Sequence, residues 1–146
     1  MARIKISLPQ NFSFTVSIPV RITDVNYGGH VGNDTILSLV HEARMQYLKH
    51  FGYTEMQFAG VGLIMADAGI EFKNQLYYED VVLVSIACTD YSKVSFDLYY
   101  KLEKVVRNDS NSKKILIAAA KTAMVCFDYT NKKIVAIPEE VRRKMQ

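Results

Sequence analysis

The chain has 146 residues, which is enough for one domain with a hydrophobic core. Hydrophobic residues make up 49% of it and charged residues 23%, so an intrinsically disordered chain is excluded. A net charge of +3 is too small for a nucleic-acid-binding surface, although it would help to attract a phosphorylated small molecule.

Neither a second domain nor a membrane segment is expected. No internal repeat or flexible linker divides residues 1–146, the N-terminus lacks the apolar core of a signal peptide, and no apolar run approaches the length of a membrane span. Cys88 and Cys126 lie in apolar, strand-like runs without metal-ligand spacing, so we expect reduced thiols. These features predict a cytoplasmic protein with no nucleic-acid or membrane partner.

The first predicted strand runs from Phe14 to Ile22, where apolar and mainly polar residues alternate. Pro19 falls on its polar side, which favours the edge of a sheet. A loop follows, with two adjacent glycines and several Asp, Asn and His residues, over residues 21–33 (RITDVNYGGHVGN). Such a loop, delivered onto the start of a helix, is a suitable place to bind developing negative charge.

The only long helical pattern covers about residues 34–50, with its start marked by Asn33 and Asp34. Its apolar face is wide, so the helix should be largely buried, and Gly52 is a candidate for its C-terminal cap. Strand patterns then cover residues 63–77, with a possible break at Gly69, and residues 80–90, 93–102, 115–128 and 133–137. We expect a polar loop over residues 107–114 and a short terminal helix after Pro138.

One strand, one long helix and then four or five antiparallel strands predict an α+β fold. The helix has a single sheet to pack against, so the sheet should curve and wrap around it. This arrangement is the hot-dog fold.

The loop and the helix resemble those of hot-dog acyl-CoA thioesterases of the 4-hydroxybenzoyl-CoA thioesterase type. Those proteins carry a loop of the form R-x-x-D-x-D-x-x-G-H-V-N-N before the central helix, often with E-x-A-R inside it. The matching residues here are Arg21, Asp24, Gly29, His30, Val31, Asn33 and Glu42–Arg44. The resemblance implies hydrolysis of acyl-CoA or acyl-ACP thioesters by a homodimer or homotetramer, without a metal or redox cofactor.

One departure from this family concerns the catalytic carboxylate. Its best-understood members have Asp where this chain has Asn26, and an amide cannot act as a base or a nucleophile at neutral pH. Plant acyl-ACP thioesterases use an Asp-x-Asn-x-His loop, which Asp24, Asn26 and His30 resemble, although here the His follows the Asn by four residues instead of two. A non-hydrolytic acyl-thioester-binding protein is therefore the alternative, and a related dehydratase is a third interpretation.

Four residues are candidates for catalysis. Asp24 is favoured as the base, with an Asx-turn or a pairing with Arg21 or Arg44 as its structural alternative. Asn26 would orient water or substrate, and His30 could be a base, a donor to the carbonyl or a structural residue. Asp34 is the second choice as base, although it is also suited to the first turn of a helix. Backbone N–H groups around residues 30–33 would stabilise the oxyanion.

Seven residues are candidates for substrate binding: Tyr27, Gly28, Gly29, Val31, Asn33, Glu42 and Asp67. The glycines allow close approach of the substrate or only form the turn, and Asn33 caps the helix or meets the thioester. Tyr27 lines the acyl pocket or an interface, and Asp67 could reach the pocket from a neighbouring subunit. Glu42 faces the site, or is a buried partner of Arg44 or of a loop amide. Eleven of the 18 basic residues follow residue 100. They either form a solvated surface or bind phosphate groups.

Overall fold

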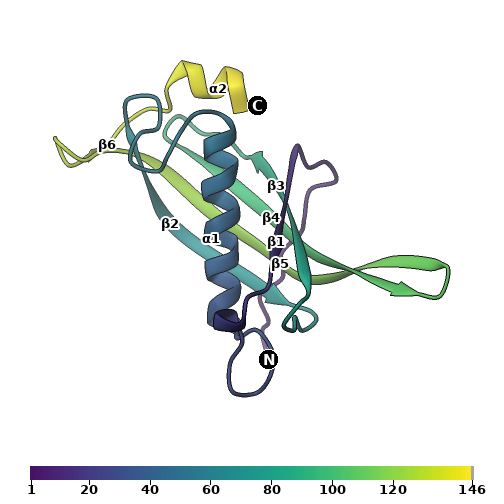
Figure 1. Ribbon diagram of the computed structural model, residues 1–146. Helices are drawn as coiled ribbons and strands as arrows, with labels where there is room; N and C mark the ends of the chain where they lie inside the picture. Colours follow the sequence, from purple (N-terminus) through teal and green to yellow (C-terminus); the bar gives the residue numbers. More distant parts are fainter. Residues whose placement is uncertain (146) are drawn as a thin grey trace.

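The computed structural model describes residues 1–145 and shows an antiparallel sheet curved around one long helix (Figure 1). The strands lie in the order β1-β3-β4-β5-β2, and β6 pairs with β5. This confirms the predicted α+β hot-dog architecture. The elements are β1 (Phe14–Pro19), a 3-10 turn η1 (Ile22–Asp24), α1 (Asn33–His50), β2 (Gly62–Phe72), β3 (Val81–Thr89), β4 (Ser95–Asn108), β5 (Asn111–Asp128), β6 (Lys133–Ile134) and α2 (Glu139–Met145).

The long helix α1 is held by one apolar face and by a cap at each end. Its buried residues are Ile36, Leu39, Val40, Ala43, Arg44, Tyr47 and Leu48. The predicted cap at Gly52 is confirmed, since this residue has φ +85° and donates its N–H to the carbonyl of Lys49. At the other end the cap is Gly32, and Asn33 is the first helical residue, so the prediction that Asn33 caps the helix was wrong.

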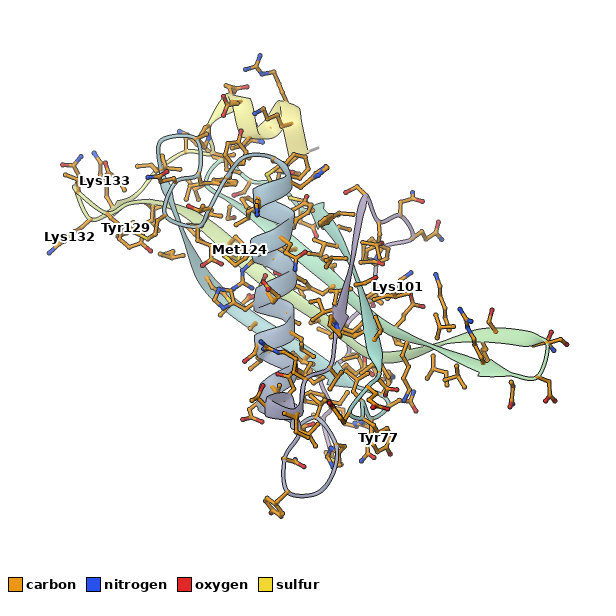
Figure 2. The ribbon with its side chains drawn as sticks, in the orientation of Figure 1. Tyr77, Lys101, Met124, Tyr129, Lys132 and Lys133 are labelled. Atoms are coloured by element: carbon orange, nitrogen blue, oxygen red, sulfur yellow. The ribbon has the colours of Figure 1, made fainter. Side chains whose placement is uncertain are left out.

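The predicted alternation along β4 is confirmed by its burial. Phe96, Leu98 and Tyr100 are fully buried, while Asp97 between them lies on the outer face of the sheet. Met124 of β5 faces the same interior, behind α1 in Figure 2. The core therefore lies between α1 and the inner face of the sheet, and the first turn of α1 lies at its margin. No helix within residues 1–145 is long and apolar enough to cross a membrane.

The predicted polar loop over residues 107–114 is instead the end of a long hairpin. Strands β4 and β5 continue to the pair Asn108 and Asn111, with a turn in which Asp109 has φ +51°. Backbone pairing across the hairpin sustains these strands, and solvent on both sides accommodates their polar side chains. Figure 1 shows this hairpin projecting beyond the rest of the sheet.

Two other strand boundaries differ from expectation. The strand predicted over residues 63–77 ends at Phe72, and its irregularity lies between Met65 and Asp67 rather than at Gly69. The strand predicted over residues 133–137 is reduced to Lys133–Ile134. Lys73 and Val135 still donate backbone hydrogen bonds to β5 beyond these ends, but the ladder of paired residues does not continue.

Candidate active site

The loop between η1 and α1 closes on itself. Val25 and Val31 form an isolated antiparallel bridge, and the N–H of Asn26 donates to the carbonyl of His30 at 3.0 Å. The turn between them contains Gly29, whose φ of +85° lies in the left-handed region that glycine adopts without strain. In Figure 1 the loop extends beyond the lower end of α1. This geometry fixes the backbone that carries His30.

The first turn of α1 presents backbone donors. Thr35 and Ile36 both donate their N–H groups to the carbonyl of Gly32, at 3.0 and 3.2 Å. The N–H groups of Asn33 and Asp34 precede these bonds, so they lie at the positive end of the helix dipole and are available for a ligand.

Val31 is excluded as an oxyanion donor. Its N–H donates to the carbonyl of Leu76 at 2.9 Å, and its side chain is buried in the core. The bond ties the loop to the segment that follows β2. Of the backbone N–H donors predicted around residues 30–33, those at the helix start therefore remain as candidates.

Gly32 is the point on which two polar side chains converge. A Cβ atom placed on Gly32 would lie 2.6 Å from Oδ1 of Asp34 and 3.5 Å from Nδ2 of Asn26. The other end of the Asn26 amide, Oδ1, accepts the N–H of Gly28 at 2.9 Å. Asp34 is exposed and belongs to none of the ion pairs within residues 1–145. Its carboxylate therefore lies beside the Asn26 amide with lone pairs available.

His30 lines a cleft of about 200 Å³ that we call the helix-start cleft. Its Nδ1 lies 3.1 Å from the carbonyl oxygen of Val31, so in the neutral ring the proton belongs on Nδ1 and Nε2 is an acceptor. The cleft is lined by His30, Val31, Asn33, Ile36, Phe72, Lys73, Asn74, Gln75 and Leu76. The structure thus brings two of the predicted polar site residues, His30 and Asn33, into one cavity.

Asp24 is committed to the turn that precedes the loop. Its side chain is buried, Oδ2 accepts the N–H of Arg21 at 2.8 Å, and Oδ1 lies 3.6 Å from the Arg21 guanidinium. The structure therefore shows the pairing with Arg21 that the sequence left open. In this position Asp24 stabilises η1. Neither Asp24 nor Asp34 is among the residues that line the helix-start cleft, but Asp34 directly follows Asn33, which does line it.

Three other candidates lie away from this cleft within one subunit. Tyr27 is fully exposed at the tip of the loop. Glu42 lines a separate groove of about 690 Å³ along the C-terminal half of α1. Asp67 lies on the outer face of the sheet, where both of its oxygens are 3.0 Å from Nζ of Lys121 and one accepts the N–H of Ala123.

Arg44 has a different partner from the one expected. Its Nε donates to Glu55 at 2.7 Å and its Nη1 to the hydroxyl of Tyr100 at 3.3 Å. Glu55 reaches it from the loop after α1, whereas Glu42 points into the groove on another side of the helix. The predicted pairing of Glu42 with Arg44 was therefore wrong, because residues two apart on a helix do not face each other.

Three residues that line the helix-start cleft, Lys73, Asn74 and Gln75, are not among the predicted site residues. They were included in a strand, although two adjacent amides in an apolar run were a signal that the strand had ended. Backbone bonds from Lys73 and Asn74 to the carbonyl of Ile117 hold this segment against β5. Within residues 1–145, no three His, Cys, Asp or Glu side chains lie close enough together to hold a metal ion.

Comparison with known proteins agrees with this geometry. A family model described as the thioesterase-like superfamily matches residues 20–145. A 1,4-dihydroxy-2-naphthoyl-CoA hydrolase from Microcystis aeruginosa is 28% identical over 126 residues, which are 84% of this chain and 86% of the relative.

Two solved structures share the fold. A 1,4-dihydroxy-2-naphthoyl-CoA thioesterase from Synechocystis superposes with a TM-score of 0.75 at 23% identity, covering 88% of this chain and 92% of its own. The 4-hydroxybenzoyl-CoA thioesterase from Pseudomonas sp. strain CBS-3 gives a TM-score of 0.77 at 15% identity, covering 91% and 99%. The predicted resemblance is confirmed: the chain belongs to the thioesterase-like superfamily and has its hot-dog fold.

Proposed function

We propose that this protein hydrolyses acyl-CoA thioesters to a free acid and a thiol at the helix-start cleft. The observation that carries the proposal is that His30 and the first residue of α1, Asn33, open into the same cleft. Membership of the thioesterase-like superfamily supports the reaction class, and the hydrolase from Microcystis aeruginosa supports CoA as the carrier.

The chemistry requires a base and donors for the oxyanion. The oxygen of a water molecule attacks the thioester carbonyl carbon while its proton passes to the base. The N–H groups of Asn33 and Asp34 stabilise the resulting oxyanion, and one such donor is worth about 3 kcal/mol. Collapse of the intermediate breaks the carbon–sulfur bond, and the leaving thiolate takes up a proton. These steps need no metal or redox cofactor, so we propose none.

We assign the base to Asp34 rather than to Asp24. Asp24 is buried and both of its oxygens face Arg21, whereas the Asp34 carboxylate is exposed beside the oxyanion donors. Nε2 of His30 accepts a hydrogen bond from the attacking water and so orients it. Asn26 holds the loop through its bond to the N–H of Gly28 and positions its amide next to Asp34.

A second copy of this chain would extend the site. Strand β2 lies at the end of the strand order, so one of its edges is available for pairing. Leu37 of α1 and Met65 of β2, which are 46% and 50% exposed, line a cleft on this side of the helix. We propose a homodimer that covers these side chains. We also propose a cytoplasmic location, since Cys88 and Cys126 are free thiols.

The test is a thiol-release assay with short, medium, long and aromatic acyl-CoAs, applied to the native protein and to Asp34→Asn and Asp24→Asn variants. Loss of a general base lowers kcat by about 10²- to 10⁴-fold. We expect this loss for Asp34→Asn with an unchanged melting temperature, because the side chain is exposed. Asp24→Asn should lower the melting temperature more than kcat.

If kcat instead fell strongly for Asp24→Asn alone, Asp24 would be the base. Thioester binding without turnover by the native protein would favour the non-hydrolytic alternative that Asn26 suggests. Formation of an unsaturated acyl product would indicate a dehydratase.

A further inference from the structure

The excess positive charge of the chain is concentrated in the projecting hairpin. We call residues 104–115 the arm. It contains four basic residues, Lys104, Arg107, Lys113 and Lys114, and one acidic residue, Asp109. Its formal charge therefore equals the net +3 of the whole chain, and the remaining residues balance one another. An excess confined to one projecting element indicates an anionic ligand there.

The arm begins beside the helix-start cleft. A second cleft of about 410 Å³, the arm-root cleft, is lined by Lys73, Asn74, Gln75, Tyr77, Lys104, Val106 and Ile115. Three of these residues, Lys73, Asn74 and Gln75, also line the helix-start cleft. The two cavities are therefore neighbours on either side of this segment. Figure 2 shows Tyr77 between the lower end of α1 and the arm.

Several cations surround the arm-root cleft. Lys113 pairs with Val106 across the hairpin, so its side chain emerges on the face of the arm that lines the cleft. Lys104 and Lys73 are each held by a carboxylate: Nζ of Lys104 lies 3.0 Å from Asp80, and Nζ of Lys73 lies 2.7 Å from Glu71.

The outer part of the arm is free of such partners. None of the ion pairs within residues 1–145 includes Arg107, Lys113 or Lys114. Their charges are not compensated locally, and an incoming phosphate would meet them first. Lys104 also lies over the ring of Tyr77, 5.1 Å from its centroid, and this ring is 47% exposed. The cleft thus offers cations together with a flat apolar surface.

We propose that the arm-root cleft binds the phosphorylated nucleotide of coenzyme A while the thioester lies in the helix-start cleft. The inference rests on the proposed thioesterase function and specifies where the carrier binds. Coenzyme A has its phosphates and its base at one end and its thioester at the other, so the phosphates need cations beside the reacting site rather than within it. A bare pantetheine thioester would leave the arm unused.

The experiment compares an acyl-CoA with the same acyl group on pantetheine, which lacks the nucleotide. The test variant is Lys113→Ala/Lys114→Ala, which removes two cations of the arm and leaves the lining of the helix-start cleft unchanged. The matched control is Lys132→Ala/Lys133→Ala, which removes two exposed lysines at the opposite end of the sheet (Figure 2). We expect the test variant to raise KM for the acyl-CoA by about tenfold or more, with unchanged KM for the acyl-pantetheine and unchanged kcat for both. The control should match the native protein.

An equal KM for the acyl-CoA in all three proteins would overturn the inference. An equal rise in KM for the acyl-CoA and the acyl-pantetheine in the test variant would also overturn it, because the lysines would then act on the part that the two substrates share. Titration calorimetry with adenosine 3′,5′-bisphosphate separates the inference from the proposed function. If the native protein hydrolyses no thioester but binds this nucleotide, and the test variant does not, the proposed function fails and the anion site stands. Absence of nucleotide binding by the native protein would refute the site.

Discussion

Substitution of Gly32 by alanine tests whether the position of the Asp34 carboxylate matters for catalysis. Gly32 has φ −69° and ψ 155°, which alanine adopts without strain, so the backbone should be unchanged. The new Cβ atom would lie 2.6 Å from Oδ1 of Asp34, and contact atoms normally stay about 3.5 Å apart. The Asp34 side chain must therefore rotate away from residue 32.

The size of the effect follows from this displacement. Moving a catalytic group by about 1 Å can lower the rate by about 100-fold, which corresponds to about 2.7 kcal/mol in activation free energy. Alanine is also a poorer N-cap than glycine, so the free energy of unfolding should fall by about 0.5–1 kcal/mol. We expect the loss of kcat/KM to exceed the loss of stability clearly.

Thiol release and urea unfolding measure the two effects separately. Gly69→Ala is the control, because its Cβ would meet only the ends of the Ile6 and Ile4 side chains, 3.3 and 3.9 Å away, and Gly69 does not line the helix-start cleft. If Gly32→Ala retained kcat/KM within about threefold of the native value, the assignment of Asp34 as the base would be refuted. His30 and Asp24 would then be the remaining candidates for the base.

Two further predictions concern assembly and pH. Met65→Lys should convert the proposed homodimer to a monomer in light scattering without unfolding it, since Met65 is 50% exposed in the single chain; an unchanged mass would argue against an interface along β2. Burial raises the pKa of the Cys88 thiol from 9.0 to about 12, so the folded thiol stays protonated at pH values where the unfolded chain ionises. Stability from this group is complete below pH 9 and is lost as the pH rises toward 12. Between pH 7.5 and pH 10.5 the native protein should thus lose about 2 kcal/mol more of its free energy of unfolding than Cys88→Ala does, as measured by urea unfolding; an equal loss in both proteins would contradict this account.

The fold was largely predictable because its signals are local. The alternation along β4 and the wide apolar face of α1 each follow from side-chain direction within one element. The cap at Gly52 likewise depends on residues within one turn of it. The long hairpin was missed because its polar residues are held by backbone pairing between strands, such as the pairing of Val105 with Lys114, which no local pattern reveals.

The candidate site was predictable in its location but not in its arrangement. The sequence placed His30 on the loop before the helix, and the structure puts it in a cleft at that helix start. The lining residues Lys73, Asn74 and Gln75 come from a segment some 40 residues further along the chain, and only the packing of β2 against β5 brings them there.

By itself, the sequence determined that a polar, glycine-containing loop leads into one long buried helix, because turn residues and apolar periodicity are properties of neighbouring residues. It could not determine which carboxylate near the helix start is buried and which is exposed. Asp24 and Asp34 are both acidic residues near the helix start, yet one is bonded to Arg21 and buried while the other lies exposed beside Asn26. Only the tertiary structure decided between them, since burial and hydrogen-bond partners depend on how the loop closes against the rest of the chain.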